Sequence, residues 1–403
     1  MKLLASRIAI ALSLPLSTYG AFAWSADPDA GWWGGGRWIL DGRYRVENVD
    51  QDGPQRTATA STLRTQAGFE TNPSLPFSAL VEIEDVRAIG AEKFDSTTNG
   101  HTGYSVVSDP EGTELNQAYL TWQRSGLRAR AGRQALVLDN ARFIGDVDFR
   151  QNQQTYDSVM LQATTPAGSR LTYGYLWRVR RFLGEDHTLG DLDMRSHVLN
   201  LSHGLLNGDR VTAYAYLLEF NTAALLASST KTFGVSYDGG LDVGTHRFFY
   251  RAEYADQSDY AENPRAGDAW YANVELGWRF PIQWLLTAGS ERLNGDGTLA
   301  FQTPLATLHK FNGHADIFLV TPPTGLEDYY ARATVPILGA RFTAAWHDFR
   351  ASEGDSRYGE ELDAEITWRL DTHWLIGVKY ADYQAKQFTA DTRKAWFWVE
   401  ASF

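Results

Sequence analysis

The 403-residue sequence contains no cysteine, so a disulfide framework and thiolate chemistry are excluded. Long apolar runs are also absent. After residue 23, no stretch approaches the roughly 20 apolar residues that a membrane-spanning helix needs, which excludes a helical membrane protein. Basic residues are outnumbered by acidic ones, 37 to 49, and the resulting net charge of -12 argues against a nucleic-acid partner.

The first 23 residues have the organisation of a secretory signal peptide. Lys2 and Arg7 supply a positive start, residues 8–16 an apolar stretch, and Ala21-Phe22-Ala23 a small-residue cleavage site. We therefore predict a signal peptide over residues 1–23 and a single exported β-barrel domain over residues 24–403.

Aromatic residues are abundant in a chain that is otherwise polar. The sequence has 14 Trp, 19 Tyr and 20 Phe, with a mean hydropathy of -0.35. Transmembrane β-barrels combine these properties, because half of each strand faces water and aromatic girdles mark both membrane interfaces.

The last eight residues alternate strictly between two faces, as a strand does. Phe397, Val399, Ala401 and Phe403 lie on one face and suit hydrocarbon, whereas the other face can meet water. An aromatic-terminated amphipathic strand at the C-terminus is characteristic of bacterial outer-membrane proteins. We predict an outer-membrane location, with membrane lipid and the barrel-assembly machinery as partners, and we expect this strand to pair with the first one, near Arg37.

Amphipathic strands separated alternately by long and short connections fill the chain. About 18 strands are predicted, an even number that places both termini on one side of the membrane. The segments are 37–49, 57–71, 77–89, 113–124, 127–137, 155–165, 169–181, 194–206, 209–220, 229–238, 245–256, 268–280, 283–293, 326–337, 338–350, 358–371, 372–384 and 392–403. The predicted fold class is all-β: a transmembrane antiparallel β-barrel with short periplasmic turns and long extracellular loops, which we favour over other all-β architectures.

Charged side chains occupy one face of these strands and are expected to line the lumen, because a charge on the lipid face costs roughly 2–4 kcal/mol at mid-membrane. The apolar face is predicted to meet lipid, as in the register that contains Leu171, Tyr173, Tyr175, Trp177 and Val179. The predicted pore-lining residues are Arg43, Arg45, Arg64, Arg128, Arg130, Arg178, Arg180, Arg247, Arg251, Arg332, Glu82, Glu84, Glu361, Asp363 and Glu365. A charged, wet lumen is expected rather than one packed with apolar side chains.

The distribution of these charges suggests opposed basic and acidic walls. We expect Arg128 and Arg130 to lie near Arg178 and Arg180, with the acids concentrated on segments 77–89 and 358–371. Rings of arginine favour anionic solutes, and a guanidinium can bind a carboxylate with two hydrogen bonds. Alternatively, the arginines pair with neighbouring acids and only fill the lumen.

A barrel of this size leaves an aqueous channel, so loops must fold inward to set the constriction. The candidates are the loops near 138–154 and 294–325. Their proposed constriction residues are Asp139, Asn140, Arg142, Phe143, Arg150, Gln151, His309, Lys310 and Asp316.

At these loops the sequence resembles the alginate export family of outer-membrane porins. The resemblance rests on GRQ at 132–134, followed by D-N-x-R-F-I-G-x-x-x-F-R-Q-N from 139, and on T-P-L-A-T-x-H-x-F-x-G-x-A-D from 303 ahead of G-L-x-D-Y at 325–329. It implies a monomeric barrel of 18 strands whose arginine-rich pore passes an anionic uronate polymer outward, together with a periplasmic export partner.

The predicted function is therefore passive diffusion of an anionic, carboxylated saccharide or polysaccharide. The alternative is an uptake porin for small anionic organic acids. A channel for hydrophobic compounds would need an apolar ladder through the lumen, and the arginines argue against it.

No enzyme activity and no cofactor are expected, because no nucleophile motif accompanies the nine histidines. Two sets of residues have metal-ligand types. One is His309, His314 and Asp316; the other, of the kind a calcium loop would use, is Asp139, Asn140, Asp146 and Asp148. Loop hydrogen bonding explains both sets more simply, so no metal site is predicted.

Overall fold

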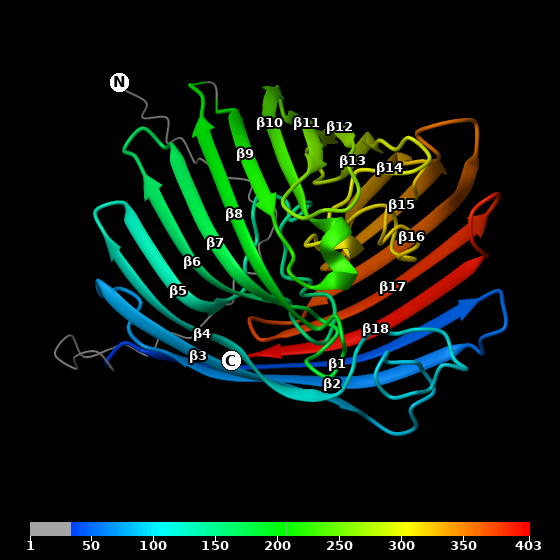
Figure 1. The fold of residues 1–403 in the computed structure, drawn as a ribbon, viewed down its shortest axis with the longest axis horizontal. Helices are drawn as coiled ribbons and strands as arrows, with labels where there is room; N and C mark the ends of the chain where they lie inside the picture. Colours follow the sequence, from blue (N-terminus) through cyan, green and yellow to red (C-terminus); the bar gives the residue numbers. More distant parts are fainter. Residues whose placement is uncertain (1–33, 207) are drawn as a thin grey trace.

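The computed structural model describes residues 34–206 and 208–403, and the predicted signal peptide lies outside the described residues. The described chain forms 18 antiparallel strands that close into one barrel (Figure 1). The strands are β1 (Arg37–Gln51), β2 (Ala58–Glu70), β3 (Phe77–Ala88), β4 (Gly112–Arg124), β5 (Leu127–Gln134), β6 (Thr155–Thr164), β7 (Arg170–Arg180), β8 (Asp191–Gly204), β9 (Arg210–Leu218), β10 (Thr230–Val243), β11 (His246–Asp259), β12 (Asp268–Arg279), β13 (Leu285–Leu293), β14 (Leu326–Ile337), β15 (Ala340–Arg350), β16 (Arg357–Arg369), β17 (Trp374–Ala385) and β18 (Thr392–Ser402). The predicted fold class is confirmed.

Two short 3₁₀ segments, η1 (Ala223–Ser228) and η2 (Leu308–Lys310), complete the regular structure. Within the described part of the chain, no helix is long and apolar enough to cross a membrane.

Each strand pairs with its neighbour in sequence, and β1 pairs with β18 to close the wall. Asp41 lies opposite Ser402 and Gln51 opposite Thr392. Because every strand has two neighbours, the sheet has no unpaired edge, which is the condition for a sheet to stand in hydrocarbon.

The two faces of the wall differ as the alternation predicts. On β12, Val274 and Leu276 point outward and are more than half exposed, whereas Tyr271 and Asn273 on the opposite face are buried. The final strand repeats this division, with Phe397 outside and Trp396 inside.

A β-bulge in β7 reverses the faces at its extracellular end. The register shifts between Leu176 and Arg178 against β8, and a matching shift occurs between Asp157 and Ser158 on β6. An inserted residue moves every later side chain to the other face. Val179, which we expected to meet lipid, is therefore completely buried inside.

The bulge also corrects the predicted position of Arg178 and Arg180. Both point to the outer face, where Arg178 lies 2.6 Å from Asp193 and Arg180 lies 3.1 Å from Asp191. They do not line the pore. Nor do they lie near Arg128, because β5 and β7 run in the same direction and Arg128 is at the periplasmic end of β5.

The interior is not uniformly wet, contrary to our expectation. The 135–154 loop and the 294–325 loop pass inside the wall, where their side chains join a buried cluster with luminal residues of β6–β18. Phe143 of the first loop packs against Tyr214 and Tyr271, with ring centroids 5.2 and 5.5 Å apart. The open part of the lumen is therefore confined to the space that the loops leave.

Candidate functional site

The two inward loops are joined to each other through their backbones. Ile144 and Leu305 form a parallel β-bridge, and the Gly145 amide donates to the Leu305 carbonyl at 2.9 Å. A Cβ at Gly145 would lie 2.1 Å from Thr307 Oγ1 and 2.8 Å from the Thr307 amide nitrogen. Only glycine permits this approach, so the loops act as one constriction element.

Arg142 attaches this element to the far wall. Its side chain is 1% exposed; Nε lies 2.8 Å from Glu291 on β13, and Nη1 donates to Thr303 Oγ1 at 3.1 Å. The same guanidinium donates to Asn312 Oδ1 at 3.3 Å. Arg142 therefore links one loop, the other loop and the barrel wall.

Arg150 and Gln151 attach the element to β1 and β2. Arg150 lies 3.1 Å from Glu47 and 3.0 Å from Asp316, so it bridges the wall and the second loop. Gln151 donates to Thr62 Oγ1 at 2.8 Å and accepts from Arg43 Nε at 3.0 Å. The motif residues shared with the porin family thus hold the loops in place.

Several loop residues adopt left-handed backbone conformations that L-amino acids rarely occupy. Asp139, Ala141 and Val147 have φ values of 54°, 69° and 52°. In the second loop, Asn312 and Asp316 have φ values of 56° and 59°. Each such residue costs of order 1–3 kcal/mol and persists only where its surroundings enforce it. The contacts of Arg142 and Arg150 supply that enforcement.

His309 and Asp316, considered at first as metal ligands, bond to each other instead. His309 Nδ1 lies 2.7 Å from Asp316 Oδ1, and its ring stacks on Phe149 at 3.7 Å. Burial lowers the pKa of His309 to about 3. Among residues 34–206 and 208–403, no group of three or more His, Cys, Asp or Glu side chains is arranged to hold a metal ion.

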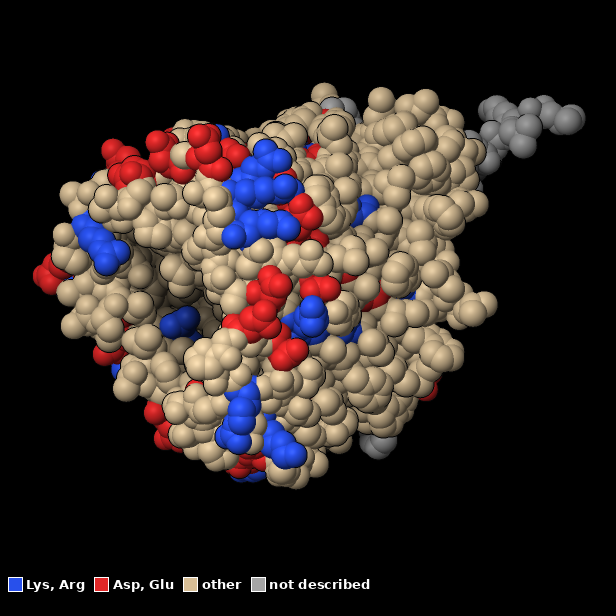
Figure 2. Space-filling view, turned by 90° about the vertical axis from the view of Figure 1, so that its right-hand side faces the viewer, with Lys and Arg blue, Asp and Glu red and all other residues tan. Residues whose placement is uncertain are grey.

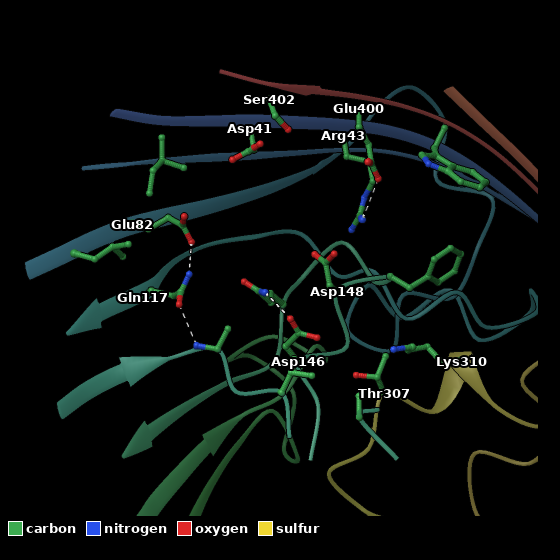
Figure 3. Close-up of a pocket in the computed structure, with 18 of the residues that line it drawn as sticks. Asp41, Arg43, Glu82, Gln117, Asp146, Asp148, Thr307, Lys310, Glu400 and Ser402 are labelled. Carbon is green, nitrogen blue, oxygen red and sulfur yellow. Dashed lines mark hydrogen bonds and ion pairs between the residues drawn. The ribbon is translucent and has the colours of Figure 1, made fainter. Parts of the chain in front are cut away.

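A cavity of about 760 Å³ lies between these loops and the wall formed by β1–β5 and β16–β18. Figure 3 shows Asp148 of the first loop close to Arg43 on the wall, with Glu400 beside Arg43; Asp146 lies farther from both, and Lys310 of the second loop also lines the cavity. The basic side chains that line it are Arg37, Arg43, Arg45, Arg128, Arg130, Lys310 and Lys379. The acidic ones are Asp41, Glu82, Asp139, Asp146, Asp148, Glu365 and Glu400.

Arg128, Arg130 and Lys310 differ from the other basic residues that line this cavity, because they form no ion pair with a described residue; Lys310 donates to the Asn140 carbonyl at 3.3 Å. Arg43 lies 3.6 Å from Glu400, and Lys379 lies 3.1 Å from Glu365. Arg128 and Arg130 form no ion pair with any described residue, and the Arg130 guanidinium lies 4.0 Å from the centre of the Tyr119 ring. These two cations are therefore available to a solute.

The loop side of the cavity carries negative charge that depends on pH. Burial, and then the neighbouring charge of Asp148, raise the pKa of Asp146 to about 6. Asp148 lies 3.1 Å from Arg64, and this pairing helps to hold its pKa below the usual range. The cavity thus combines two cations of β5 that lack an ion pair with acids on the loop.

The predicted constriction residues divide into two groups. Asp139, Asn140 and Lys310 line the cavity. The side chains of the others are buried in the packed element that holds the loops: Arg142, Phe143, Arg150, Gln151, His309 and Asp316.

The predicted pore-lining residues other than Arg178 and Arg180 lie on the luminal face. Arg43, Arg45, Arg128, Arg130, Glu82 and Glu365 border the cavity. Arg64, Glu84, Glu361 and Asp363 are also luminal but are buried. The luminal face elsewhere carries Arg247, Arg251 and Arg332. Sequence reasoning missed Lys379, which the alternation of β17 could have identified because Lys379 shares a face with buried Ala381 and Tyr383.

The side toward which the long loops project carries groups of acidic and basic side chains around a hollow (Figure 2). A basic side chain is visible within that hollow. The apolar outer wall, the closed sheet and the charged interior together define an outer-membrane channel of the porin class.

Comparisons with known proteins specify the family. Residues 41–335 match the family described as alginate export, and the chain belongs to that family. The predicted family and outer-membrane location are confirmed. No curated protein sequence matches the chain.

Solved structures share the fold. The crystal structure of Pseudomonas aeruginosa OccK9 (OpdG) has a TM-score of 0.73 and 14% identity, covering 91% of this chain and 98% of that one. Pseudomonas aeruginosa OccK5 (OpdH) gives 0.69 and 12%, again with 91% and 98% coverage. Acinetobacter baumannii OccAB4 gives 0.71 and 14% with the same coverage.

Proposed function

We propose that this channel passes anionic, carboxylated saccharides or polysaccharides by passive diffusion, in the manner of an alginate exporter. The observation that carries the proposal is the pair Arg128 and Arg130, two luminal cations that border the 760 Å³ cavity without an ion-pair partner among the described residues. A carboxylate is the ligand that best matches the forked guanidinium donors.

Acids of the loop line the same cavity. Asp146 and Asp148 repel an anion there, whereas Arg128 and Arg130 on β5 attract it. We expect this separation of charge to favour anions along the β5 wall.

Planar-bilayer recording tests this function. In a salt gradient the reversal potential should indicate anion preference, and oligouronates should block the current. Replacing both cations (R128Q/R130Q) should reduce the anion-to-cation permeability ratio several-fold while leaving the barrel folded. Cation preference in the parent channel, together with no block by oligouronates, would overturn the proposal.

A second candidate function is uptake of small organic acids. The attachment of the two loops to each other and to the wall favours it. Backbone and side-chain bonds fix the 135–154 and 294–325 loops to each other and to the wall, which leaves a small cavity. Block by oligouronates of increasing length separates the candidates. Stronger block by longer oligomers supports a polymer path, whereas block only by single-residue acids supports uptake.

A further inference from the structure

Several arginines inside the barrel and away from its periplasmic rim pair with acids. Arg45 pairs with Asp109, Arg142 lies 2.8 Å from Glu291, and Arg251 lies 2.8 Å from Glu253. These pairs balance charge within the wall and the loops. Arg130 and Arg332 form no ion pair with a described residue and lie against tyrosine rings instead.

Five further arginines lie at the opposite end of the lumen. Each is within two residues of a short-turn end of its strand and shares a face with luminal residues, as Arg210 does with buried Thr212. The five, named here the periplasmic arginine ring, are Arg170, Arg210, Arg279, Arg341 and Arg369. They belong to β7, β9, β12, β15 and β16.

The periplasmic arginine ring is not neutralised by the acids at its end. None of its members forms an ion pair with a described residue. Nearby acids have other partners: Asp242 lies 2.9 Å from Arg247 and Glu70 lies 2.6 Å from Arg37. Asp371 accepts hydrogen bonds from two backbone amides of its own turn and keeps its negative charge, so it offsets one of the five arginines. The whole chain has a formal net charge of -12, whereas the periplasmic mouth carries an excess of positive side chains.

We propose that the periplasmic arginine ring makes the channel electrically asymmetric, so that anions enter it more readily from the periplasmic mouth than from outside. This rests on the proposed function, because it requires that anions are the permeant species. A patch of one sign raises the local concentration of counter-ions and their entry rate, by roughly 10-fold or more at low ionic strength. The ring consists of other residues than Arg128 and Arg130, which border the cavity, although Arg128 also lies at the periplasmic end of its strand.

The asymmetry should depend on salt. The distance over which fixed charge acts is about 10 Å at 0.1 M salt and about 3 Å at 1 M. A rim of exposed guanidinium groups therefore influences entry at the lower concentration and is screened at the higher one.

Single-channel currents at equal voltages of opposite sign test the ring. At about 0.1 M KCl the larger current should exceed the smaller by roughly twofold, and the ratio should approach one near 1 M. The variant R170Q/R210Q/R341Q/R369Q should bring the ratio close to one at low salt while keeping the sign of the reversal potential. A folded-barrel band on unheated gels establishes that each variant has assembled.

A matched control removes the same number of charges from the outer face. Arg133, Arg178, Arg180 and Arg195 pair there with Asp157, Asp191, Asp193 and Glu219. Glutamine at these four positions should leave the current ratio unchanged.

The outcomes separate the two proposals. Persistent asymmetry in the ring variant, with anion preference intact, overturns the ring but not the proposed function. Equal loss of asymmetry in the outer-face control also overturns it, because the effect would then follow total charge. If the parent channel shows no anion preference, the proposed function itself is overturned.

Discussion

Arg43 on β1 lies directly opposite Glu400 on β18, with their side chains 3.6 Å apart, at the seam where the first and last strands meet. The same guanidinium donates to Gln151 of the 135–154 loop at 3.0 Å. One residue thus contacts both the seam and the constriction element. Closure of the wall and docking of the loop are therefore coupled through Arg43.

Substituting Gly145 should widen the channel. A methyl group there would meet Thr307 Oγ1 at 2.1 Å and the Thr307 backbone at 2.8 Å, so the two loops must separate in G145A. We expect a higher single-channel conductance. G204A is the matched control, because a Cβ at Gly204 meets nothing within 4 Å. Equal conductance in G145A and the parent would show that the loop junction does not limit flow.

Breaking the Arg142–Glu291 pair should loosen the loops. Removing one partner of a buried pair leaves an uncompensated charge and costs about 3–5 kcal/mol. R142M should lower the temperature at which the barrel unfolds on gels and increase current noise. R142M/E291Q should recover part of the loss, since the unpaired carboxylate is gone. A double variant no more stable than R142M would contradict this explanation.

Anion selectivity should fall as the pH rises through about 6. Burial, together with the charge of Asp148, raises the pKa of Asp146 to about 6. The carboxyl is therefore neutral below that pH and negative above it, where it repels anions in the cavity. Reversal potentials across this range should show the change in the parent and a weaker one in D146N. D355N, in an exposed part of the 351–356 loop, should titrate like the parent.

Neutralising Arg178 and Arg180 should have little effect on transport. Both lie on the outer face, and Arg178 is 36% exposed beside Asp191 and Asp193. Exposed ion pairs contribute about 0–1 kcal/mol. R178Q/R180Q should keep the parent's reversal potential and nearly its thermal stability. A fall in selectivity as large as that of R128Q/R130Q would place these side chains back in the solute path.

Strand positions and the closed wall could be predicted because each strand depends on local alternation. Successive residues of a strand point to opposite faces, so the sequence alone predicts that Val274 and Leu276 face lipid and that Tyr271 faces inward. The bulge at Leu176 and Arg178 could not be predicted in this way. An extra residue changes the face of its successors without changing the composition around it.

The sequence predicted the candidate site less completely than it predicted the barrel wall. Arg128 follows from alternation, but the lack of an acidic partner depends on neighbours that only the three-dimensional register shows. The loop motif pointed to the lumen through its resemblance to a family. Its arginines, Arg142 and Arg150, nevertheless proved to be buried attachments, because the acids they bind come from distant strands.

The seam between β1 and β18 also determines when the protein can finish folding. Gln51 donates to Thr392 across it, although the two residues are 341 positions apart. Contacts between such distant segments form slowly, and unpaired strand edges are prone to aggregate while they wait. The first strand is made early and finds its second neighbour only when the last has been synthesised. Until β18 has formed, β1 therefore lacks its second neighbour and one edge of the sheet stays open.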